Sequence, residues 1–323
     1  MGQRAGAMEG VGVVPAAKPM SVLLTGAAGF FGAHVARLLL DEGHQVTAIV
    51  RPGTDPWRIA DLKSRLTIIA GELASVGSMR DRIRAQRPDI CIHLAWKGWS
   101  GKAEADANMS SLGMSLELLR LMPDLSCGRF VAAGTCFEYD LSGQVLSEAS
   151  PLRPHDLYGG CKKSLFEVAQ EFSALTGVSV VTPRIFYSYG PLEDGRRLVP
   201  SIAQALLRGH VAKATAGEQV RDYLHVADIA SAIWVIAQSN ATGAVNVASG
   251  EPVTIARIAT RIADLLGRPE LLQLGALDYR EGEPMHILGD PRKLRGLGWS
   301  PAYSLDSGLA STLEWWQQKV SYA

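Results

Sequence analysis

The N-terminal half of the chain alternates continuous apolar runs with stretches that have a single apolar face. The apolar runs lie at 21–26, 45–50, 66–71, 90–95, 129–134 and 178–186. The amphipathic stretches, which predict helices, include one containing Phe31 and Val35 and others at 104–122 and 158–175. Continuous apolar runs are typical of parallel strands buried on both faces. The pattern therefore predicts an α/β fold whose doubly wound parallel sheet has helices on both sides.

After about Pro183 this rhythm gives way to a chain richer in turns. A helix and a short strand are expected within 225–249, and further helices at 255–266 and around 305–319. We interpret 20–182 and 225–250 as a large N-terminal domain. The remaining pieces, 183–224 and 251–323, then form a smaller, discontinuous C-terminal lobe that binds substrate.

Composition and charge exclude several classes of partner. The 323 residues are 47% hydrophobic and 20% charged, and the formal net charge is +0. Nothing in this balance favours binding to nucleic acid or to an anionic membrane. A bound anion would have to be met by individual arginines and backbone amides. The cysteines, Cys91, Cys127, Cys136 and Cys161, lack metal-ligand spacing, so we expect no metal site, reduced thiols and a cytoplasmic setting.

Residues 1–19 fit neither a strand nor a helix. Their apolar part is interrupted by Glu9, Pro15 and Lys18, whereas a secretory signal needs an unbroken apolar run of about seven to fifteen residues. No run approaches the roughly eighteen apolar residues that would span a bilayer. We interpret 1–19 as a disordered leader.

A glycine-rich turn follows the first apolar run and opens the first amphipathic stretch. It is Thr25-Gly26-Ala27-Ala28-Gly29-Phe30-Phe31-Gly32. Glycines at this point permit a tight turn and a close approach of backbone to a pyrophosphate, which faces the helix N-terminus. Glycine-rich turns also arise for steric reasons alone, but the position between strand and helix favours a dinucleotide site in a Rossmann-type fold.

Tyr158 and Lys162 lie four residues apart in the second predicted helix, so both side chains emerge on one face. A tyrosine has an ordinary pKa of about 10 and must exchange a proton near neutral pH to act as a catalyst. A lysine cation one turn away favours the phenolate and is expected to lower that pKa. This pair predicts acid–base chemistry.

These motifs resemble the extended short-chain dehydrogenase/reductases, and specifically the NAD-dependent epimerase/dehydratase family. The resemblance runs over about residues 20–318. It rests on the Gly-x-x-Gly-x-x-Gly spacing, Tyr-x-x-x-Lys, Gly-Thr-Cys-Phe-Glu-Tyr at 134–139, and the segments 217–228, 246–250, 279–284 and 297–301. It implies a Rossmann domain, a nicotinamide cofactor and a nucleotide-linked sugar as substrate.

The resemblance implies a set of cofactor contacts. They are Gly26, Gly29, Phe30, Phe31 and Gly32 of the turn, Arg51, Glu72, Leu73, Leu94, Ala95, Trp96, Asn108, Tyr158, Lys162, Pro183 and Ile185. Glu72 stands where the family often has Asp. At the end of the second strand an acid would bind the ribose hydroxyl of NAD, whereas an arginine accommodates the 2′-phosphate of NADP. Arg51 favours NADP(H), but an arginine can also stack on adenine, so the cofactor is written NAD(P).

Thr135 is implied as the third catalytic residue, beside Tyr158 and Lys162. Its hydroxyl would bind the reacting oxygen of the sugar, although a hydroxyl at a strand end can also merely cap its own backbone. The implied substrate contacts are Thr135, Cys136, Phe137, Tyr187, Arg221 and Arg280. The two arginines would meet the diphosphate, since a guanidinium suits two phosphate oxygens. Asp222, His225 and Asp228 are expected to organise this corner structurally.

The sequence restricts the expected reaction to fewer types than the family as a whole catalyses. The dehydratases place Asp-Glu directly after the Thr, where this chain has Cys136 and Phe137, so dehydration is not expected. Tyr187 stands where sugar epimerases commonly have Asn, and Trp96 and Trp99 crowd the sugar side. We therefore expect reduction of the C4 keto group of a nucleotide-linked 4-keto-6-deoxyhexose. A 4-epimerase with tightly bound NAD stays open, as does a non-catalytic NAD(P)-sensing protein.

The helices predicted at 104–122 and 158–175 have more apolar surface than one sheet can cover. In the family such helices pair into a four-helix bundle. A homodimer is the expected assembly.

Overall fold

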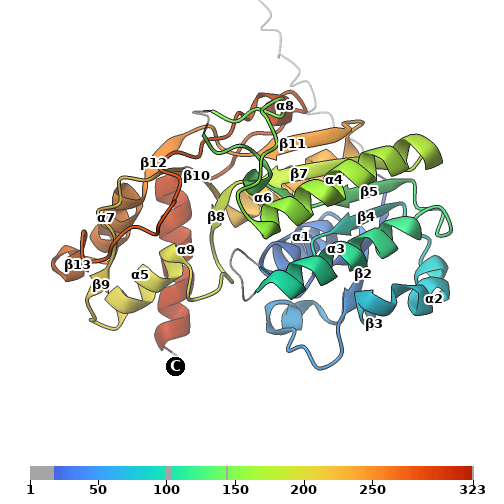
Figure 1. Cartoon of the computed structure of the whole chain (residues 1–323). Helices are drawn as coiled ribbons and strands as arrows, with labels where there is room; N and C mark the ends of the chain where they lie inside the picture. The colour runs from blue at the N-terminus through green and yellow to red at the C-terminus, as the bar shows by residue number, and fades with distance from the viewer. Residues whose placement is uncertain (1–17, 99–103, 143–144, 322–323) are drawn as a thin grey trace, which may run out of the picture.

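The computed structural model describes residues 18–98, 104–142 and 145–321 (Figure 1). The predicted leader lies outside the described residues except for Lys18 and Pro19, and Trp99 also lies outside them. The described chain forms a larger part built on a central sheet and a smaller part composed of short elements (Figure 1).

The central sheet contains the predicted apolar runs as parallel strands. Its order is β11-β7-β5-β4-β1-β2-β3, and β6 pairs with β7. The strands are β1 (Ser21–Thr25), β2 (Gln45–Val50), β3 (Thr67–Ala70), β4 (Ile90–His93), β5 (Arg129–Ala132), β6 (Gly134–Thr135), β7 (Ser179–Ile185) and β11 (Gly243–Val247). The order reverses between β1 and β4, which is the switch point at which such sheets bind dinucleotides.

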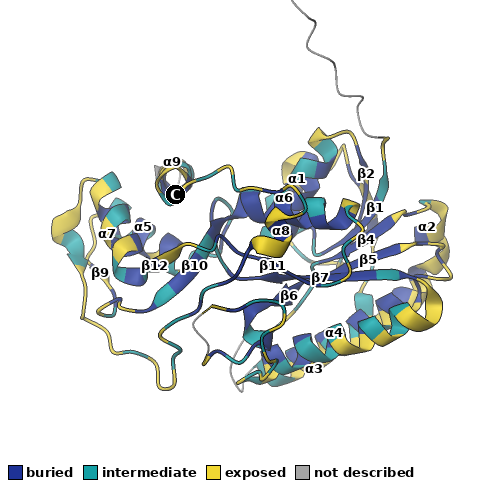
Figure 2. Cartoon of the chain, turned by 90° about the horizontal axis from the view of Figure 1, so that it is seen from above, coloured by how far each residue is buried: buried dark blue, intermediate teal, exposed yellow. Residues whose placement is uncertain are grey.

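Helices cover both faces of this sheet, as predicted. On one face α1 (Phe30–Asp41) packs against α6 (Val226–Gln238), and on the other α3 (Ala105–Arg120) packs against α4 (Leu157–Thr176) (Figure 2). Smaller helical elements are η1 (Trp57–Leu62), η2 (Leu73–Met79), α2 (Arg80–Ala85) and η4 (Cys136–Glu138). A buried apolar cluster lies between the sheet and each helical layer, so burial on both faces explains the unbroken apolar runs.

The smaller lobe is assembled from the chain after β7. Its helices α5 (Leu198–Leu207), α7 (Ile255–Leu265) and α9 (Leu305–Ser321) enclose a separate apolar core. Its strands are β8 (Tyr187–Tyr189), β9 (Ala212–Lys213), β10 (Val220–His225), β12 (Pro252–Thr254) and β13 (Leu272–Gln273), with η5 (Pro269–Leu271) and α8 (Arg292–Arg295) in the connections. In β12-β10-β8, β10 runs antiparallel to β12 and parallel to β8.

The boundary between the two parts differs slightly from the prediction. β7 continues to Ile185, three residues beyond the boundary predicted at 182, and Gly243–Val247 pairs with its residues 181–185. The helix α5 falls where the sequence indicated only turns. Its apolar residues occupy one short stretch flanked by glycine-rich segments, which obscures a helical period.

Two buried aspartates tie the lobes together. Asp222 accepts hydrogen bonds from the backbone of Ser249, Gly250 and Gly289. Asp228, at the start of α6, accepts from the backbone amides of Ala302 and Tyr303. These bonds give both carboxylates a structural role, as expected for this corner.

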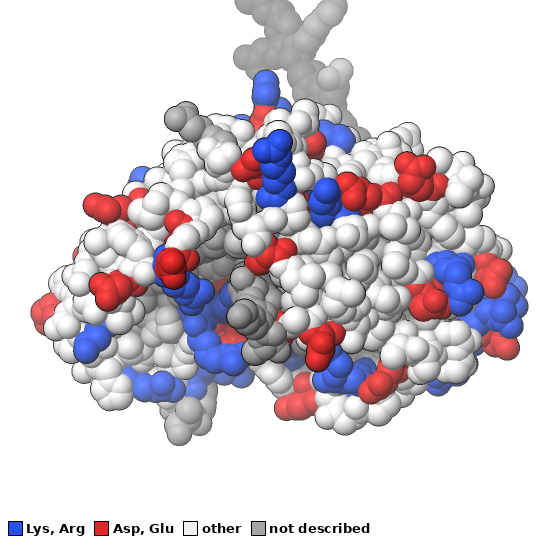
Figure 3. Space-filling model, in the orientation of Figure 1, with Lys and Arg blue, Asp and Glu red and all other residues white. Residues whose placement is uncertain are grey.

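None of the described helices is long and apolar enough to cross a membrane. The four cysteines are free and buried. On the face seen in Figure 3, acidic and basic side chains are interspersed over most of the surface. Basic side chains gather along the boundary between the two lobes (Figure 3).

Candidate active site

The glycine turn brings α1 directly against the end of β4. Gly26 has φ +77°, and a Cβ there would lie 2.7 Å from the backbone of Leu94 and Ala95. A Cβ on Gly32 would lie 2.0 Å from the Gly26 carbonyl oxygen. Gly29 caps α1 without any side-chain hydrogen bond, which leaves the first amides of the helix directed at the turn. Only glycines let the turn, β4 and the start of α1 pack this closely, and the helix N-terminus they expose fits a pyrophosphate.

A chain of buried hydrogen bonds holds the backbone opposite the turn. His93 Nδ1 lies 2.6 Å from Thr25 Oγ1, and His93 Nε2 lies 2.8 Å from Ser115 Oγ. Ser115 donates to a backbone carbonyl, so it accepts from His93 Nε2–H. Burial lowers the pKa of His93 to about 3, and the nearby Lys162 charge lowers it further, which keeps the ring neutral. Thr25 Oγ1 also accepts from the amide of Ala95, so the network positions a predicted cofactor contact.

The end of β2 presents Arg51 to solvent. Its Nε donates to Thr54 Oγ1 at 3.2 Å, and the rest of its guanidinium extends from the sheet edge. Arg58 serves a different purpose, because it donates to the carbonyl of Leu192 and stacks on Trp57. Glu72 is exposed and Leu73 half-buried at the end of β3. Of these two arginines, Arg51 is thus the one exposed directly after β2, where the adenosine is predicted to bind.

Local features at the start of α4 bring Tyr158 beside Thr135. Asp156 caps the helix by accepting from the amide of Gly159 at 2.8 Å. A Cβ on Gly159 would lie 2.2 Å from the Phe137 carbonyl oxygen, so only glycine lets the helix start this close to that backbone. The phenol of Tyr158 therefore comes into hydrogen-bonding contact with Thr135.

Thr135 is held by a capping box and a buried ion pair. Its amide donates to Glu138 Oε1 at 2.8 Å, while its own hydroxyl oxygen accepts from the amide of Phe137. Glu138 Oε2 accepts from Arg184 Nε at 2.7 Å, and both side chains are fully buried. The hydroxyl of Thr135 thus caps η4, as the structural alternative expected, and also makes a hydrogen bond with Tyr158. The ion pair of Glu138 and Arg184 holds Thr135 in position from the buried side.

Lys162 lies one turn along α4 and is buried. Its ammonium donates to the carbonyl oxygen of Ala133 at 2.7 Å and lies 3.9 Å from the centre of the Trp96 ring. Burial lowers the pKa of Lys162 to about 7, and the charge of Glu138 opposes that shift. The indole therefore provides an electron-rich face to a cation that has lost most of its water.

The pKa of Tyr158 differs from the expectation. Burial raises it above its ordinary value, and the hydrogen bond with Thr135 opposes the shift only in part. The expected lowering by Lys162 is absent because that ammonium is directed at Ala133 and Trp96. At neutral pH Tyr158 is consequently a protonated phenol, a state that suits a proton donor.

Aromatic rings wall the space in front of Tyr158. Trp96 and Phe137 both lie edge-on to its ring at 6.3 Å between centroids. Phe137 also lies 6.2 Å from Tyr187, which extends the wall toward the substrate lobe. Trp96 is fixed by donating from Nε1 to Asn108 Oδ1 at 2.9 Å. Asn108, predicted to contact the cofactor, thus orients a neighbour of Lys162.

The residues predicted to bind the substrate differ from one another in burial and in contacts. Arg221 is buried, lies over the Tyr187 ring, and donates to Glu283 Oε1 at 3.1 Å. Arg280 is exposed, and its carbonyl accepts from the amide of Glu283, so one turn joins the two arginines. Cys136 lies beside Thr135, with which its side chain makes a hydrogen bond. Its thiol is buried in an apolar cluster against which Phe137 and Tyr187 also pack, and burial raises its pKa to about 12.

The remaining predicted cofactor contacts lie around the same switch point. Pro183 and Ile185 are buried in β7, and Ile185 pairs with Thr135. Phe30 and Phe31 begin α1, with ring centroids 5.2 Å apart. Together with the turn, these residues surround the carboxyl ends of β1, β4 and β7.

Sequence reasoning missed the Glu138–Arg184 pair and the support that Trp96 gives to Lys162. A signal for Glu138 was available, because Thr135-x-x-Glu138 has the spacing of a capping box. Nothing local indicated Arg184, whose partner lies 46 residues away.

Comparisons with known proteins agree with this geometry. The model of the NAD dependent epimerase/dehydratase family matches residues 22–248. A probable UDP-glucuronate 4-epimerase of Rhizobium meliloti is 27% identical, over 94% of this chain and 99% of that protein. A UDP-glucose 4-epimerase of Thermotoga maritima, solved with UDP-glucose, has a TM-score of 0.85 at 23% identity, over 93% of this chain and 100% of that one. MoeE5, solved with UDP-glucuronic acid and NAD, has a TM-score of 0.80 at 27% identity, over 93% of this chain and 99% of that one.

The parallel sheet, the glycine cradle and the Thr135–Tyr158–Lys162 corner define a nicotinamide-dependent enzyme of the short-chain dehydrogenase/reductase type. Within that class, the chain belongs to the NAD dependent epimerase/dehydratase family.

Proposed function

We propose that this enzyme reduces the C4 keto group of a nucleotide-linked 4-keto-6-deoxyhexose with NAD(P)H. The main support is the buried pair of hydroxyls on Thr135 and Tyr158. An aromatic wall lies beside this pair, at the positions where a dehydratase would have an acid and a base. Phe137 occupies that wall, and Cys136 is a buried thiol whose pKa burial raises to about 12. The pair can donate a proton to a carbonyl oxygen but offers no second acid–base couple for removing water.

The chain supplies the proton and the orientation. When bound, the nicotinamide provides the hydride. Tyr158, kept protonated by burial, donates its phenolic proton to the oxygen at C4. Thr135 donates a hydrogen bond to the same oxygen, and the capping box with Glu138 keeps its hydroxyl at that position.

Lys162 has an electrostatic role in this proposal. Its ammonium, held between Ala133 and Trp96, is proposed to bind the hydroxyls of the nicotinamide ribose and so to position the cofactor beside Tyr158. Burial lowers the pKa of Lys162 to about 7, so the charged form that makes this contact is present below that pH and is lost as the pH rises through it.

NADP(H) is the proposed preference. Arg51 presents a solvent-facing guanidinium at the end of β2, where a 2′-phosphate would need a cation. On the substrate side, Arg221 and Arg280 are proposed to bind the diphosphate. Arg221 would exchange its bond with Glu283 for phosphate oxygens, since a guanidinium matches both groups.

A nucleotide-sugar 4-epimerase with tightly bound NAD is the second candidate. It is favoured by the relatives, because the Rhizobium meliloti protein and the Thermotoga maritima protein are named as 4-epimerases. An epimerase must let its keto-sugar intermediate rotate so that the opposite face meets the nicotinamide. The rings of Trp96, Phe137 and Tyr187 restrict that rotation.

A substrate panel separates the two candidates. Purified protein would be incubated with NADPH or NADH and nucleotide-linked 4-keto-6-deoxyhexoses, and separately with UDP-hexoses and UDP-uronic acids. Reduction predicts one cofactor oxidised for each sugar reduced, measured at 340 nm and by mass spectrometry. Interconversion of UDP-sugars without cofactor consumption would replace reduction with epimerisation.

A homodimer through α3 and α4 is also proposed. Both helices expose large apolar side chains, among them Met109 and Val168, and Leu175 is 87% exposed. Pairing these faces would bury them in a four-helix bundle. Light scattering should give twice the chain mass, and Val168→Glu should shift the protein toward monomer.

A further inference from the structure

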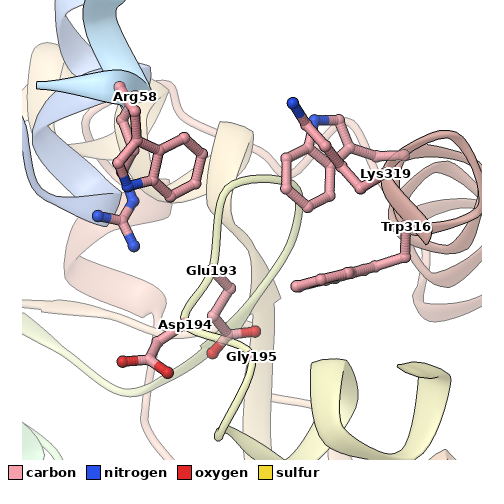
Figure 4. Close-up of a pocket in the computed structure, with 8 residues that line it drawn as sticks. Arg58, Glu193, Asp194, Gly195, Trp316 and Lys319 are labelled. Atoms are coloured by element: carbon pink, nitrogen blue, oxygen red, sulfur yellow. The ribbon is translucent and has the colours of Figure 1, made fainter. Parts of the chain in front are cut away.

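A cavity of about 420 Å³ lies outside the residues assigned to the candidate active site (Figure 4). Three segments that are distant in sequence line it. They are Trp57 and Arg58 of η1, Glu193, Asp194 and Gly195 after β8, and Trp315, Trp316 and Lys319 of α9. The cavity therefore lies where the Rossmann domain meets the smaller lobe, and its size suits a small organic ligand.

Two buried polar atoms in its lining have no hydrogen-bond partner among the described residues. They are Oε2 of Glu193 and Nε1 of Trp316, whose side chains belong to residues only 7% and 8% exposed. In Figure 4 the carboxyl of Glu193 and the ring of Trp316 both extend into the space between the three segments. Buried polar groups are nearly always paired, so an unpartnered acceptor and an unpartnered N–H donor among the residues that line one cavity point to a missing partner.

Two cations and two further aromatic rings also line the cavity. The Arg58 guanidinium lies 4.4 Å from the Trp57 ring centre, and the Lys319 ammonium lies 5.6 Å from that of Trp315. Asp194 is already paired, because both of its carboxylate oxygens accept from Arg196. Arg58 and Lys319 thus add two cations to the lining beside the Asp194–Arg196 pair, and these cations can bind an anionic group of a ligand.

We propose that this cavity binds a nucleotide, with its base among the indoles, its amide-type edge on Glu193 and Trp316, and its phosphate toward Arg58 and Lys319. A base such as guanine presents an N–H beside a C=O, which complements the acceptor of Glu193 and the donor of Trp316 together. Indole faces stack on any base, and arginine and lysine both bind phosphate. The site is separate from the cofactor and sugar sites and does not rest on the proposed reaction.

Ionisation of Glu193 provides an independent signature. Burial raises the pKa of this carboxyl to about 8, the charge of Arg197 opposes the shift, and Asp194 adds to it. Arg58 and Lys319 face the cavity from the other two segments. A carboxylate that accepts a base N–H must be ionised, so binding lowers its pKa. Nucleotide binding should therefore release protons near pH 7 and should strengthen as the pH rises toward 8.

The test uses guanosine 5′-monophosphate as the probe and NADPH-saturated protein, so that the cofactor site is filled. Calorimetry would compare wild type with Glu193→Gln and Trp316→Phe, and with Glu314→Gln, a matched change at an exposed position of α9. Loss of one hydrogen bond should weaken binding about tenfold in the first two variants and leave the third unchanged. Neither altered atom has a partner in the structure, so both variants should keep the unfolding temperature of wild type.

A crystal soaked with 8-bromoguanosine 5′-monophosphate locates the base through the anomalous signal of bromine. The proposal requires a peak among Trp57, Trp315 and Trp316. A peak found only beside Tyr158 and Arg221, or equal affinities of Glu193→Gln and wild type, would overturn it.

Discussion

The cofactor half and the substrate half of the active site differ in how their residues are held. On the cofactor side, a helix cap at Asp156 and the close approach of Gly159 to Phe137 place Tyr158 against Thr135. On the substrate side, Arg221 depends on Glu283, which lies 62 residues away in a turn. The helix start that presents Tyr158 is therefore set by a local cap and one close backbone approach, whereas the anion-binding corner is built by the packing of the small lobe.

The largest effect is expected from removing the proton donor. Tyr158→Phe leaves the ring and its contacts with Trp96 and Phe137, but nothing remains to protonate the oxygen at C4. The turnover number should fall about 10³-fold with little change in cofactor affinity. Tyr279→Phe, in the loop of the substrate lobe, is the control and should stay near wild type. Unchanged activity in Tyr158→Phe would reopen a non-catalytic, NAD(P)-sensing role.

The glycine cradle can be tested with two glycines that share a left-handed backbone. Gly26 and Gly43 have φ of +77° and +84°, but a Cβ on Gly43 meets nothing within 4 Å. Gly26→Ala should raise the dissociation constant for NAD(P)H about 100-fold, because the turn must move away from Leu94 and Ala95. Gly43→Ala bears similar backbone strain without that collision, so it should bind cofactor normally. If both variants lose the same affinity for cofactor in a fluorescence titration, backbone strain alone explains the loss, and the collision with Leu94 and Ala95 does not.

Substitutions in the substrate half of the site should change KM for the nucleotide sugar. Arg221→Met removes the guanidinium proposed to bind the diphosphate, so KM for the nucleotide sugar should rise about 30-fold while NAD(P)H affinity stays constant. Glu283→Gln weakens the competing bond to Arg221 and should change KM much less. A fall in kcat at constant KM in Arg221→Met would contradict the assignment of this arginine to substrate binding.

The smallest expected effect concerns the indole beside Lys162. Trp96→Leu removes the aromatic face that lies 3.9 Å from the ammonium, and a cation–π contact contributes roughly 0.5–2 kcal/mol. The charged form of Lys162 is then less favoured, so its pKa should fall by about one unit from about 7. Activity depends on the ammonium, so the alkaline fall in kcat should move to lower pH. Trp96→Phe keeps an aromatic face and should shift the profile less.

Much of the fold was predictable because burial on both faces leaves a simple mark on a parallel strand. The run 45–50 is β2 itself, and the helices expected at 104–122 and 158–175 are α3 and α4 within two residues. The Tyr158–Lys162 pair was predictable for the same reason, since helical spacing alone puts both side chains on one face.

The other features of the structure depend on contacts between residues that are far apart in the sequence, which motif spacing does not indicate. Arg184 meets Glu138 only because β6 pairs with β7, and Glu193 and Trp316 share a cavity only because α9 packs beside the loop after β8. Burial is likewise not visible in the spacing. The substrate contact expected of Cys136 stays a prediction, whereas its burial as the first residue of η4 follows from the fold.

Deuterium tracing tests most directly whether the Thr135–Tyr158–Lys162 corner reduces a sugar at C4. The protein would be incubated with NADPH carrying deuterium at C4 of the nicotinamide and with a nucleotide-linked 4-keto-6-deoxyhexose. The proposed mechanism predicts one deuterium at C4 of the product sugar for each NADPH oxidised, and loss of that transfer in Tyr158→Phe. If no deuterium reaches the sugar from NADPH or NADH, while UDP-sugars are interconverted at C4, the account of this enzyme as a reductase is wrong.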